Sequence, residues 1–154
     1  MATERGAQLF VTVWAAARRS VRLVEQRLRE EGADDHELAL VLELVLADGP
    51  LTTTAVAERM GVAFMTASDA LTRLESRGTV RQAPNPADRR SSLFMLTEQG
   101  EVQARRALSI LAPLADELAA AAGLSVEDIQ GLAARLNEAF TKEERGVTPR
   151  SPSR

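Results

Sequence analysis

Apolar residues recur at intervals of three and four over most of this chain, and this spacing predicts a mainly helical protein. The first stripe lies on an amphipathic helix expected over residues 7–31. The second helix is apolar on nearly every side, so we expect it to be buried centrally and to end near Ala47. Asp34 and Glu37 suit the N-cap and third positions at its start. The apolar members of the first stripe are Phe10, Trp14, Ala17, Val21, Val24 and Leu28.

Two shorter helices joined by a three-residue turn follow, an arrangement typical of a helix-turn-helix unit. Leu51 can pair briefly as a strand, and Thr52 is the expected N-cap of the first short helix. The second short helix is predicted over residues 64–77. Residues 79–83 and 91–96 then predict the two strands of a β-hairpin around a turn rich in proline and arginine. A hairpin directly after a helix-turn-helix unit predicts a winged helix.

Two long helices are predicted after the hairpin, the second of them over residues 125–141. Pro113 lies inside the first and should kink it, because proline cannot donate the backbone hydrogen bond of its turn. Ser125 with Asp128 forms the N-terminal cap expected of the second. Residues 142–154 have no apolar period, so we expect a flexible tail there.

The chain of 154 residues fits one domain of ordinary size. Within it, residues 34–97 form the expected winged helix-turn-helix core. The flanking helices, within residues 7–33 and 98–141, have apolar stripes that one copy of this size would struggle to cover alone. Packing them against a second copy would bury these stripes, so we expect an obligate-type homodimer. The alternative is that the stripes form an ordinary intramolecular core.

The composition narrows the classes of function. Cysteine is absent, which excludes disulfides, thiolate metal sites and cysteine nucleophiles. The sequence also has no glycine-rich phosphate loop and no histidine beside a nucleophile, so we expect neither an enzyme nor a bound metal or cofactor. It has no run of about 18 apolar residues that could span a membrane. Its first residues lack the apolar core of a signal peptide, so we expect a cytoplasmic protein.

Positive charge is concentrated in the winged-helix segment. Residues 72–92 contain five arginines and two acidic residues, a net charge of +3, although the whole chain has a net charge of −3. A basic surface beside a helix is typical of a site for a polyanion such as DNA. The side chains off the buried face of the helix 64–77 can contact bases, and the arginines beyond it suit phosphates or a narrow minor groove. The candidate DNA-contacting residues are Phe64, Met65, Thr66, Ser68, Asp69, Thr72, Arg73, Arg77, Arg89 and Arg90.

Three stretches of this segment are similar to a known family. They read Leu51-Thr-Thr-Thr-Ala-Val-Ala-Glu-Arg-Met-Gly-Val, Leu74-Glu-Ser-Arg-Gly and Asp88-Arg-Arg-Ser-Ser-Leu-Phe-Met-Leu-Thr-Glu-Gln-Gly. They resemble the winged-helix core of the multiple-antibiotic-resistance regulator (MarR) family, and the resemblance covers residues 34–105. It implies a homodimeric bacterial transcription factor that binds double-stranded DNA. Such a protein is usually a repressor relieved by a small anionic or phenolic effector.

The resemblance also implies roles for single residues. Arg90 would be the wing-tip arginine that enters the minor groove, and the Asp88 carboxylate would orient its guanidinium group. The helix from Phe64 would be the recognition helix, and a homodimer would present two of them to a pseudo-palindromic operator. Two positions depart from the family pattern. Ala63 replaces the common Ser or Thr N-cap, and Asp69 places a negative charge towards DNA where a basic or neutral residue is common.

A pocket for the effector is implied between the dimer helices and the winged helix. Trp14, Arg18 and His36 are the candidates, because they offer a flat apolar wall, a cation and an imidazole that titrates near neutral pH. Each also has a plainer explanation, as a packing residue or a solvated charge. A second interpretation of the chain is a winged-helix module for protein–protein interaction with weak or lost DNA binding. Asp69 and the net negative charge would favour it.

Overall fold

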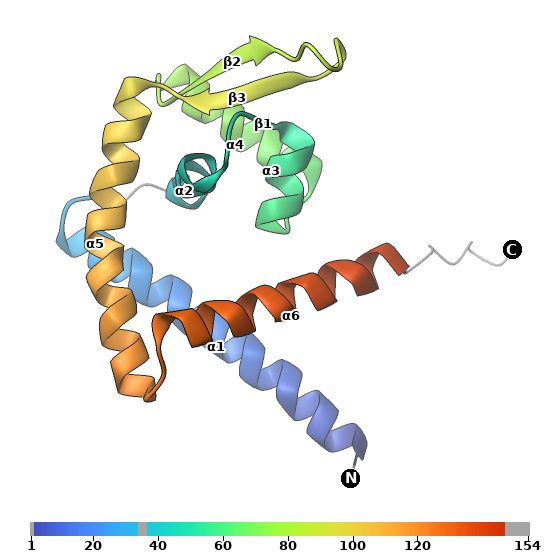
Figure 1. Cartoon of the computed structure of the whole chain (residues 1–154), viewed down its shortest axis with the longest axis vertical. Coiled ribbons are helices and arrows are strands. Elements are labelled where there is room, and N and C mark those ends of the chain that lie inside the picture. Colours follow the sequence, from blue (N-terminus) through green and yellow to red (C-terminus); the bar gives the residue numbers. More distant parts are fainter. Residues whose placement is uncertain (1, 34–36, 147–154) are drawn as a thin grey trace, which may run out of the picture. The chain divides into compact units, whose positions relative to one another are not determined.

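The computed structural model describes residues 2–33 and 37–146. The fold is mainly helical with a small antiparallel β wing, as the sequence predicted (Figure 1). The chain divides into two compact units, residues 1–111 and 112–154. In chain order the elements are α1 (Ala2–Glu30), α2 (Leu38–Leu46), β1 (Leu51–Thr52), α3 (Thr53–Met60), α4 (Phe64–Ser76), β2 (Val80–Pro84), β3 (Ser92–Leu96), α5 (Glu98–Ala122) and α6 (Val126–Gly146).

The core of the first unit is formed mainly by the helix-turn-helix region and α2. Leu40 and Val41 of α2 are at most 1% exposed, which confirms the predicted central position of this helix, although Leu46 at its end is exposed. The end of α1 and the first half of α5 complete this core with a few residues each. The cluster consists of Leu28, Leu38, Leu40, Val41, Leu44, Val56, Ala57, Ala67, Leu71, Leu74, Val80, Phe94, Ala104 and Ala107.

The helix-turn-helix unit follows the prediction closely. The backbone N–H of Ala55 donates to Thr52 Oγ1 at 3.2 Å, which confirms the predicted cap of α3. Gly61 ends α3 with a φ of 63°, a left-handed conformation that favours glycine. α4 then runs from Phe64 to Ser76, one residue short of its predicted end.

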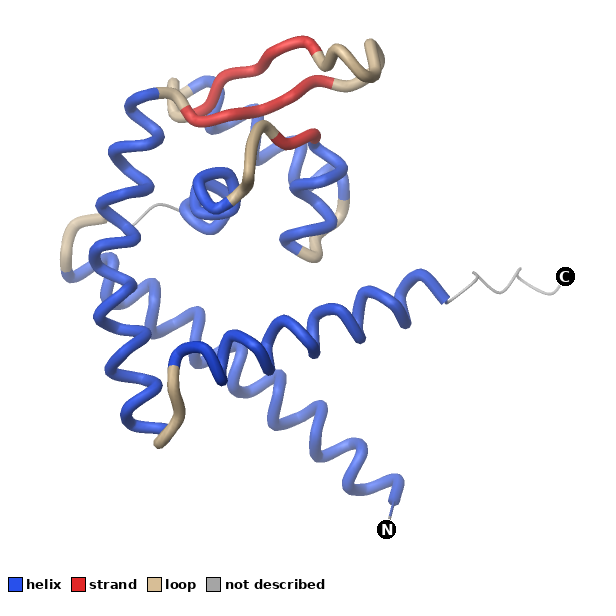
Figure 2. The backbone as a smooth tube through the Cα atoms, viewed as in Figure 1, coloured by secondary structure: helices blue, strands red, loops and turns tan. Residues whose placement is uncertain are grey.

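The wing is the antiparallel hairpin of β2 and β3. Its register pairs Val80 with Leu96 at one end and Pro84 with Ser92 at the other. β1 pairs with the other edge of β3, so the strand order is β1-β3-β2. Figure 2 shows the loop that joins β2 to β3 at the tip of the wing. The short strand predicted at Leu51 is therefore confirmed.

Thr97 and Gly100 fix the junction between the wing and α5. Thr97 Oγ1 donates to the carbonyl oxygen of Gly78 at 2.6 Å and accepts from the backbone N–H of Gly100 at 3.1 Å. A Cβ atom added at Gly100 would lie 2.1 Å from the carbonyl oxygen of Thr79. Only glycine therefore allows the first turn of α5 to approach the start of β2 this closely.

The first two helices begin at other residues than predicted. α1 begins at Ala2, ahead of the predicted start at residue 7. α2 begins at Leu38, and Glu37 occupies its N-cap position without a capping hydrogen bond from its side chain. The predicted place of Glu37 as the third residue of this helix is therefore wrong. The predicted cap, Asp34, lies outside the described residues.

The two C-terminal helices agree with the prediction at their starts. α5 is one helix through Pro113, and the kink expected there stays a prediction. The backbone N–H of Asp128 donates to Ser125 Oγ at 3.0 Å, and that of Ser125 donates to Asp128 Oδ2 at 3.2 Å, which confirms the cap of α6. α6 continues to Gly146, so the predicted start of the tail is wrong, because the lysine and glutamates there sustain a helix. Residues 147–154 lie outside the described part.

Both terminal helices leave large apolar side chains exposed. Phe10 and Trp14 of α1 are 64% and 65% exposed, and only the end of the predicted stripe, at Leu28, enters the core. On α6, Leu132 is 57% exposed. Among the described residues no single helix is long and apolar enough to cross a membrane, and α5 and α6 reach that length and composition only as a bent pair. The exposed large apolar residues of α1 and α6 are Leu9, Phe10, Val11, Trp14, Val21, Ile129, Leu132 and Phe140.

Candidate nucleic-acid interface

α4 turns one face to the core and the opposite face outward. Its buried residues are Ala67, Leu71 and Leu74. At about 100° per residue, the positions opposite them include Met65, Asp69 and Thr72, which are all exposed and which we call the outward face. The other candidate base-contacting residues of α4 also lie off the buried face. Phe64, Thr66 and Arg73 are exposed, and Ser68 is half-buried.

The start of α4 lacks a side-chain cap. Ala63 has an extended conformation and makes no capping hydrogen bond, as expected from the missing hydroxyl group. The first backbone N–H groups of a helix have no partner within the helix. Because the Ala63 side chain has no acceptor, it cannot bond to those of α4. Phe64 and Met65, in the same turn, are 53% and 64% exposed. This end of α4 therefore offers apolar surface to a binding partner.

The wing tip is a loop closed by its own hydrogen bonds. Asn85 Nδ2 donates to Ser91 Oγ at 2.8 Å, and the Ser91 hydroxyl donates to the carbonyl oxygen of Asp88 at 3.2 Å. Asp88 Oδ1 accepts from the backbone N–H of Arg90 at 2.9 Å. Asp88 thus orients Arg90 through its backbone here, and contact with the guanidinium group stays a prediction. Arg89 and Arg90 are both exposed at this tip.

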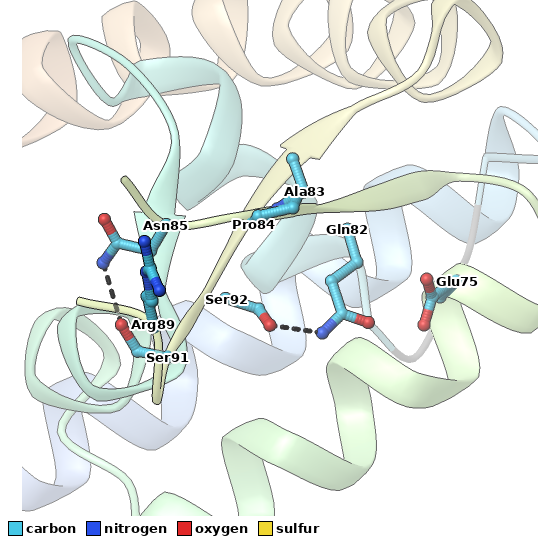
Figure 3. A pocket seen from close by; sticks show the side chains of 8 residues that line it. All are labelled: Glu75, Gln82, Ala83, Pro84, Asn85, Arg89, Ser91 and Ser92. Atoms are coloured by element: carbon cyan, nitrogen blue, oxygen red, sulfur yellow. Dashed lines mark hydrogen bonds between the residues drawn. The ribbon is translucent and has the colours of Figure 1, made fainter. Parts of the chain in front are cut away.

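A polar recess of about 450 Å³ lies between α4 and the wing (Figure 3). Glu75 of α4 stands at one end of it, and Arg89 stands at the other beside the loop of the wing. Between them, Gln82 Nε2 donates to Ser92 Oγ at 2.5 Å across the two strands. The recess therefore combines a cation and a carboxylate with hydrogen-bonding groups on the side of the wing that faces α4.

Arg73 and Arg77 form ion pairs with one carboxylate. Arg73 Nε lies 2.6 Å from Glu37 Oε1, and Arg77 Nη2 lies 2.5 Å from Glu37 Oε2. The Glu37 side chain is only 11% exposed, whereas those of Arg73 and Arg77 are 58% and 45% exposed. Sequence reasoning missed this cluster, because Glu37 precedes the two arginines by 36 and 40 residues. Two of the predicted cations therefore share one carboxylate within the protein, which offsets one of their two positive charges.

Arg81, a further arginine of the basic segment, lies apart from the recess. It lines another cavity, of about 450 Å³, with Leu44 of α2, Met95 of β3 and Arg105 of α5. Alternation along β2 places Arg81 on the opposite face of the sheet from Gln82, which faces the recess. The local charge of +3 is therefore divided between different surfaces.

The structure brings two of the three effector candidates together. Arg18 Cζ lies 4.8 Å from the centroid of the Trp14 ring, a cation–π geometry on the surface of α1. Trp14 is 65% exposed, so this pair lies at the surface of the chain. His36, the third candidate, lies outside the described residues.

Comparison with protein families matches residues 37–92 to the model of the MarR family. The matched segment runs from the residue before α2 to the first residue of β3, so it contains the helix-turn-helix unit and the wing loop. A sequence comparison with curated proteins found no match.

Several solved structures share this fold over most of the chain. The transcriptional regulator BldR from Sulfolobus solfataricus is 22% identical, with 92% of this chain and 99% of that one covered and a TM-score of 0.71. A mutant MarR from E. coli complexed with operator DNA is 21% identical, with 86% and 93% covered and a TM-score of 0.68. The PcaV regulator from Streptomyces coelicolor in complex with its natural ligand is 23% identical, with 81% and 89% covered and a TM-score of 0.61. At these identities the likeness establishes the fold alone.

Proposed function

Because this chain belongs to the MarR family, we propose that it is a sequence-specific DNA-binding regulator of transcription, acting as a dimeric repressor. In this role α4 enters the major groove, and the wing of β2 and β3 reaches the backbone or the adjacent minor groove. The protein is a regulator and not an enzyme, in keeping with its family.

The observation that supports this proposal most is the position of the wing tip relative to α4. The outward face of α4 is accessible, and the polar recess separates it from a tip that presents Arg89 and Arg90. Duplex DNA needs a protrusion that fits the major groove and cations that meet its phosphates. The winged helix of this chain supplies both within one unit.

We further propose that two copies associate through α1, α5 and α6. The large apolar side chains of α1 and α6 are exposed in the single chain, and burying them is the main favourable term in protein association. A two-fold dimer would present two α4 helices to half-sites about 34 Å apart, one helical turn of DNA. The operator would then be pseudo-palindromic.

A small aromatic or anionic effector is proposed to relieve repression. The stacked pair of Trp14 and Arg18 combines a flat apolar ring with a cation, which suits an aromatic acid. The PcaV structure is that of a protein of this fold in complex with its natural ligand. His36 stays a candidate for the same site. Effector binding can lower DNA affinity only if the effector prefers the conformation that does not bind DNA.

The proposal is tested by selecting duplexes from a random pool with the purified protein. We expect enrichment of pseudo-palindromic sequences, because each copy of α4 would read one half-site. If the bound duplexes share no sequence, the protein binds DNA without specificity. If no duplex is retained at low salt, the alternative of a protein–protein interaction module is favoured, and exposed Asp69 on the outward face would be one reason for it.

A further inference from the structure

Glu37 connects the start of α2 to the recognition helix. Its two carboxylate oxygens bind different arginines, Arg73 through Nε and Arg77 through Nη2. Charge-assisted hydrogen bonds of this length are the strong kind. The carboxylate is mostly shielded from water, so releasing both arginines would leave it poorly solvated. Phosphates on the DNA would have to compensate for that loss before they could draw both arginines away from Glu37.

The two arginines occupy one flank of α4. At about 100° per residue, Arg73 and Arg77 lie on the side of the helix opposite Glu75. Glu75 lines the recess beside the wing, so the arginines lie on the flank away from the wing, where Glu37 holds them. The outward face, Met65, Asp69 and Thr72, lies between these flanks.

The hydroxyl groups near the outward face already use their protons within the helix. Thr72 Oγ1 donates to the carbonyl oxygen of Ser68 at 2.9 Å, and Ser76 Oγ donates to that of Arg73 at 2.8 Å. The outward face therefore presents a carboxylate, hydroxyl lone pairs and apolar groups. Carboxylates accept from the amino group of cytosine, and apolar groups contact the methyl group of thymine. Guanine offers two acceptors in the major groove and is most often read by arginine.

We propose that Glu37 is a specificity-determining residue that holds Arg73 and Arg77 off the DNA. With these arginines engaged, major-groove reading falls to the outward face, which selects base amino groups through Asp69 and thymine methyl groups through Met65. Glu37 also limits the number of phosphates that α4 neutralises. This inference rests on the proposed function, because it concerns how the same helix meets DNA.

The test compares wild type with Glu37→Gln in DNA binding at several potassium chloride concentrations. Each phosphate contact adds about 0.9 to the slope of log K against log salt, so the released arginines should steepen that slope by roughly 1 to 2. The affinity of E37Q for a duplex of unrelated sequence should also be higher than that of wild type. Adding Arg73→Ala to E37Q should make the slope shallower again by roughly 1, since it removes one of the two released cations.

Glu101→Gln is the matched control, because Glu101 pairs with Arg105 on α5 at 3.4 Å and its loss changes the net charge by the same amount. We expect E101Q to keep the wild-type slope.

The outcomes separate this inference from the proposed function. If wild type binds selected DNA and folded E37Q has an unchanged slope, the inference fails and the proposed function stands. If wild type binds no DNA, the proposed function itself fails. Arginine Nε–H resonances of wild type, recorded with and without DNA, give a measurement that does not depend on E37Q folding. The Arg73 signal, assigned with Arg73→Lys, should stay in place when DNA is added. A displacement as large as that of Arg90 would overturn the inference.

Discussion

At the scale of single residues, Arg90 is the side chain of the wing that we expect to enter the minor groove. It is exposed at the tip, and Asp88 fixes its backbone through the hydrogen bond to its N–H group. We expect Arg90→Ala to cost about 1–3 kcal/mol of binding free energy and to relax preference at the operator flanks. Fluorescence anisotropy with selected duplexes measures this. Arg81→Ala is the matched control, because Arg81 lies on the other face of the sheet, and equal losses for both variants would remove the assigned role of Arg90.

Asp128 gives a second residue-level prediction, which concerns pH. Hydrogen bonds from the Ser125 hydroxyl and backbone N–H lower the pKa of the Asp128 carboxyl below its ordinary value of 3.8. A lowered folded-state pKa means that the ionised carboxylate stabilises the cap above the unfolded pKa. That contribution is lost as the pH falls through the folded pKa. NMR titration of Asp128 should show a pKa below 3.8, and Ser125→Ala should raise it. An unchanged pKa in that variant would contradict the cap.

At the scale of elements, the junction of the wing with α5 depends on a close backbone approach. We expect Gly100→Ala to destabilise the fold by about 1–3 kcal/mol, because the added Cβ would overlap the Thr79 carbonyl oxygen. Gly131→Ala is the control, since a Cβ there meets nothing within 4 Å and alanine favours a helix by about 1 kcal/mol over glycine. Urea unfolding measures both variants. Equal stability of the two would show that the junction tolerates a side chain.

The elements that were predicted correctly depend on local signals. Thr52 and Ser125 cap their helices through residues three positions away, and such patterns are visible in the sequence. The ion pairs of Glu37 join residues at least 36 positions apart, and nothing local distinguishes a capping glutamate from one that binds arginines. For α1, periodicity predicted an apolar stripe that one copy would struggle to cover, and Phe10 is 64% exposed, but a periodic pattern does not identify the surface that covers it.

At the scale of the whole molecule, the exposed apolar side chains of α6 predict self-association. We expect wild type to sediment as a dimer at micromolar concentration. Leu132→Glu should shift it towards the monomer, because a charge would then have to be buried in the interface. Leu46→Glu on α2 is the control, with a similarly exposed leucine outside the proposed interface. A monomeric wild type would contradict the dimer, and a dimeric L132E would move the interface away from this part of α6.

The central claim, that α4 and the wing bind duplex DNA, is tested most directly by the salt dependence of binding. The measurement is the association constant of wild type for a selected duplex over a series of potassium chloride concentrations. The account predicts a linear fall of log K with log salt, with a slope of about −0.9 for each phosphate contacted. A flat response, or no binding at the lowest salt concentration, would contradict it.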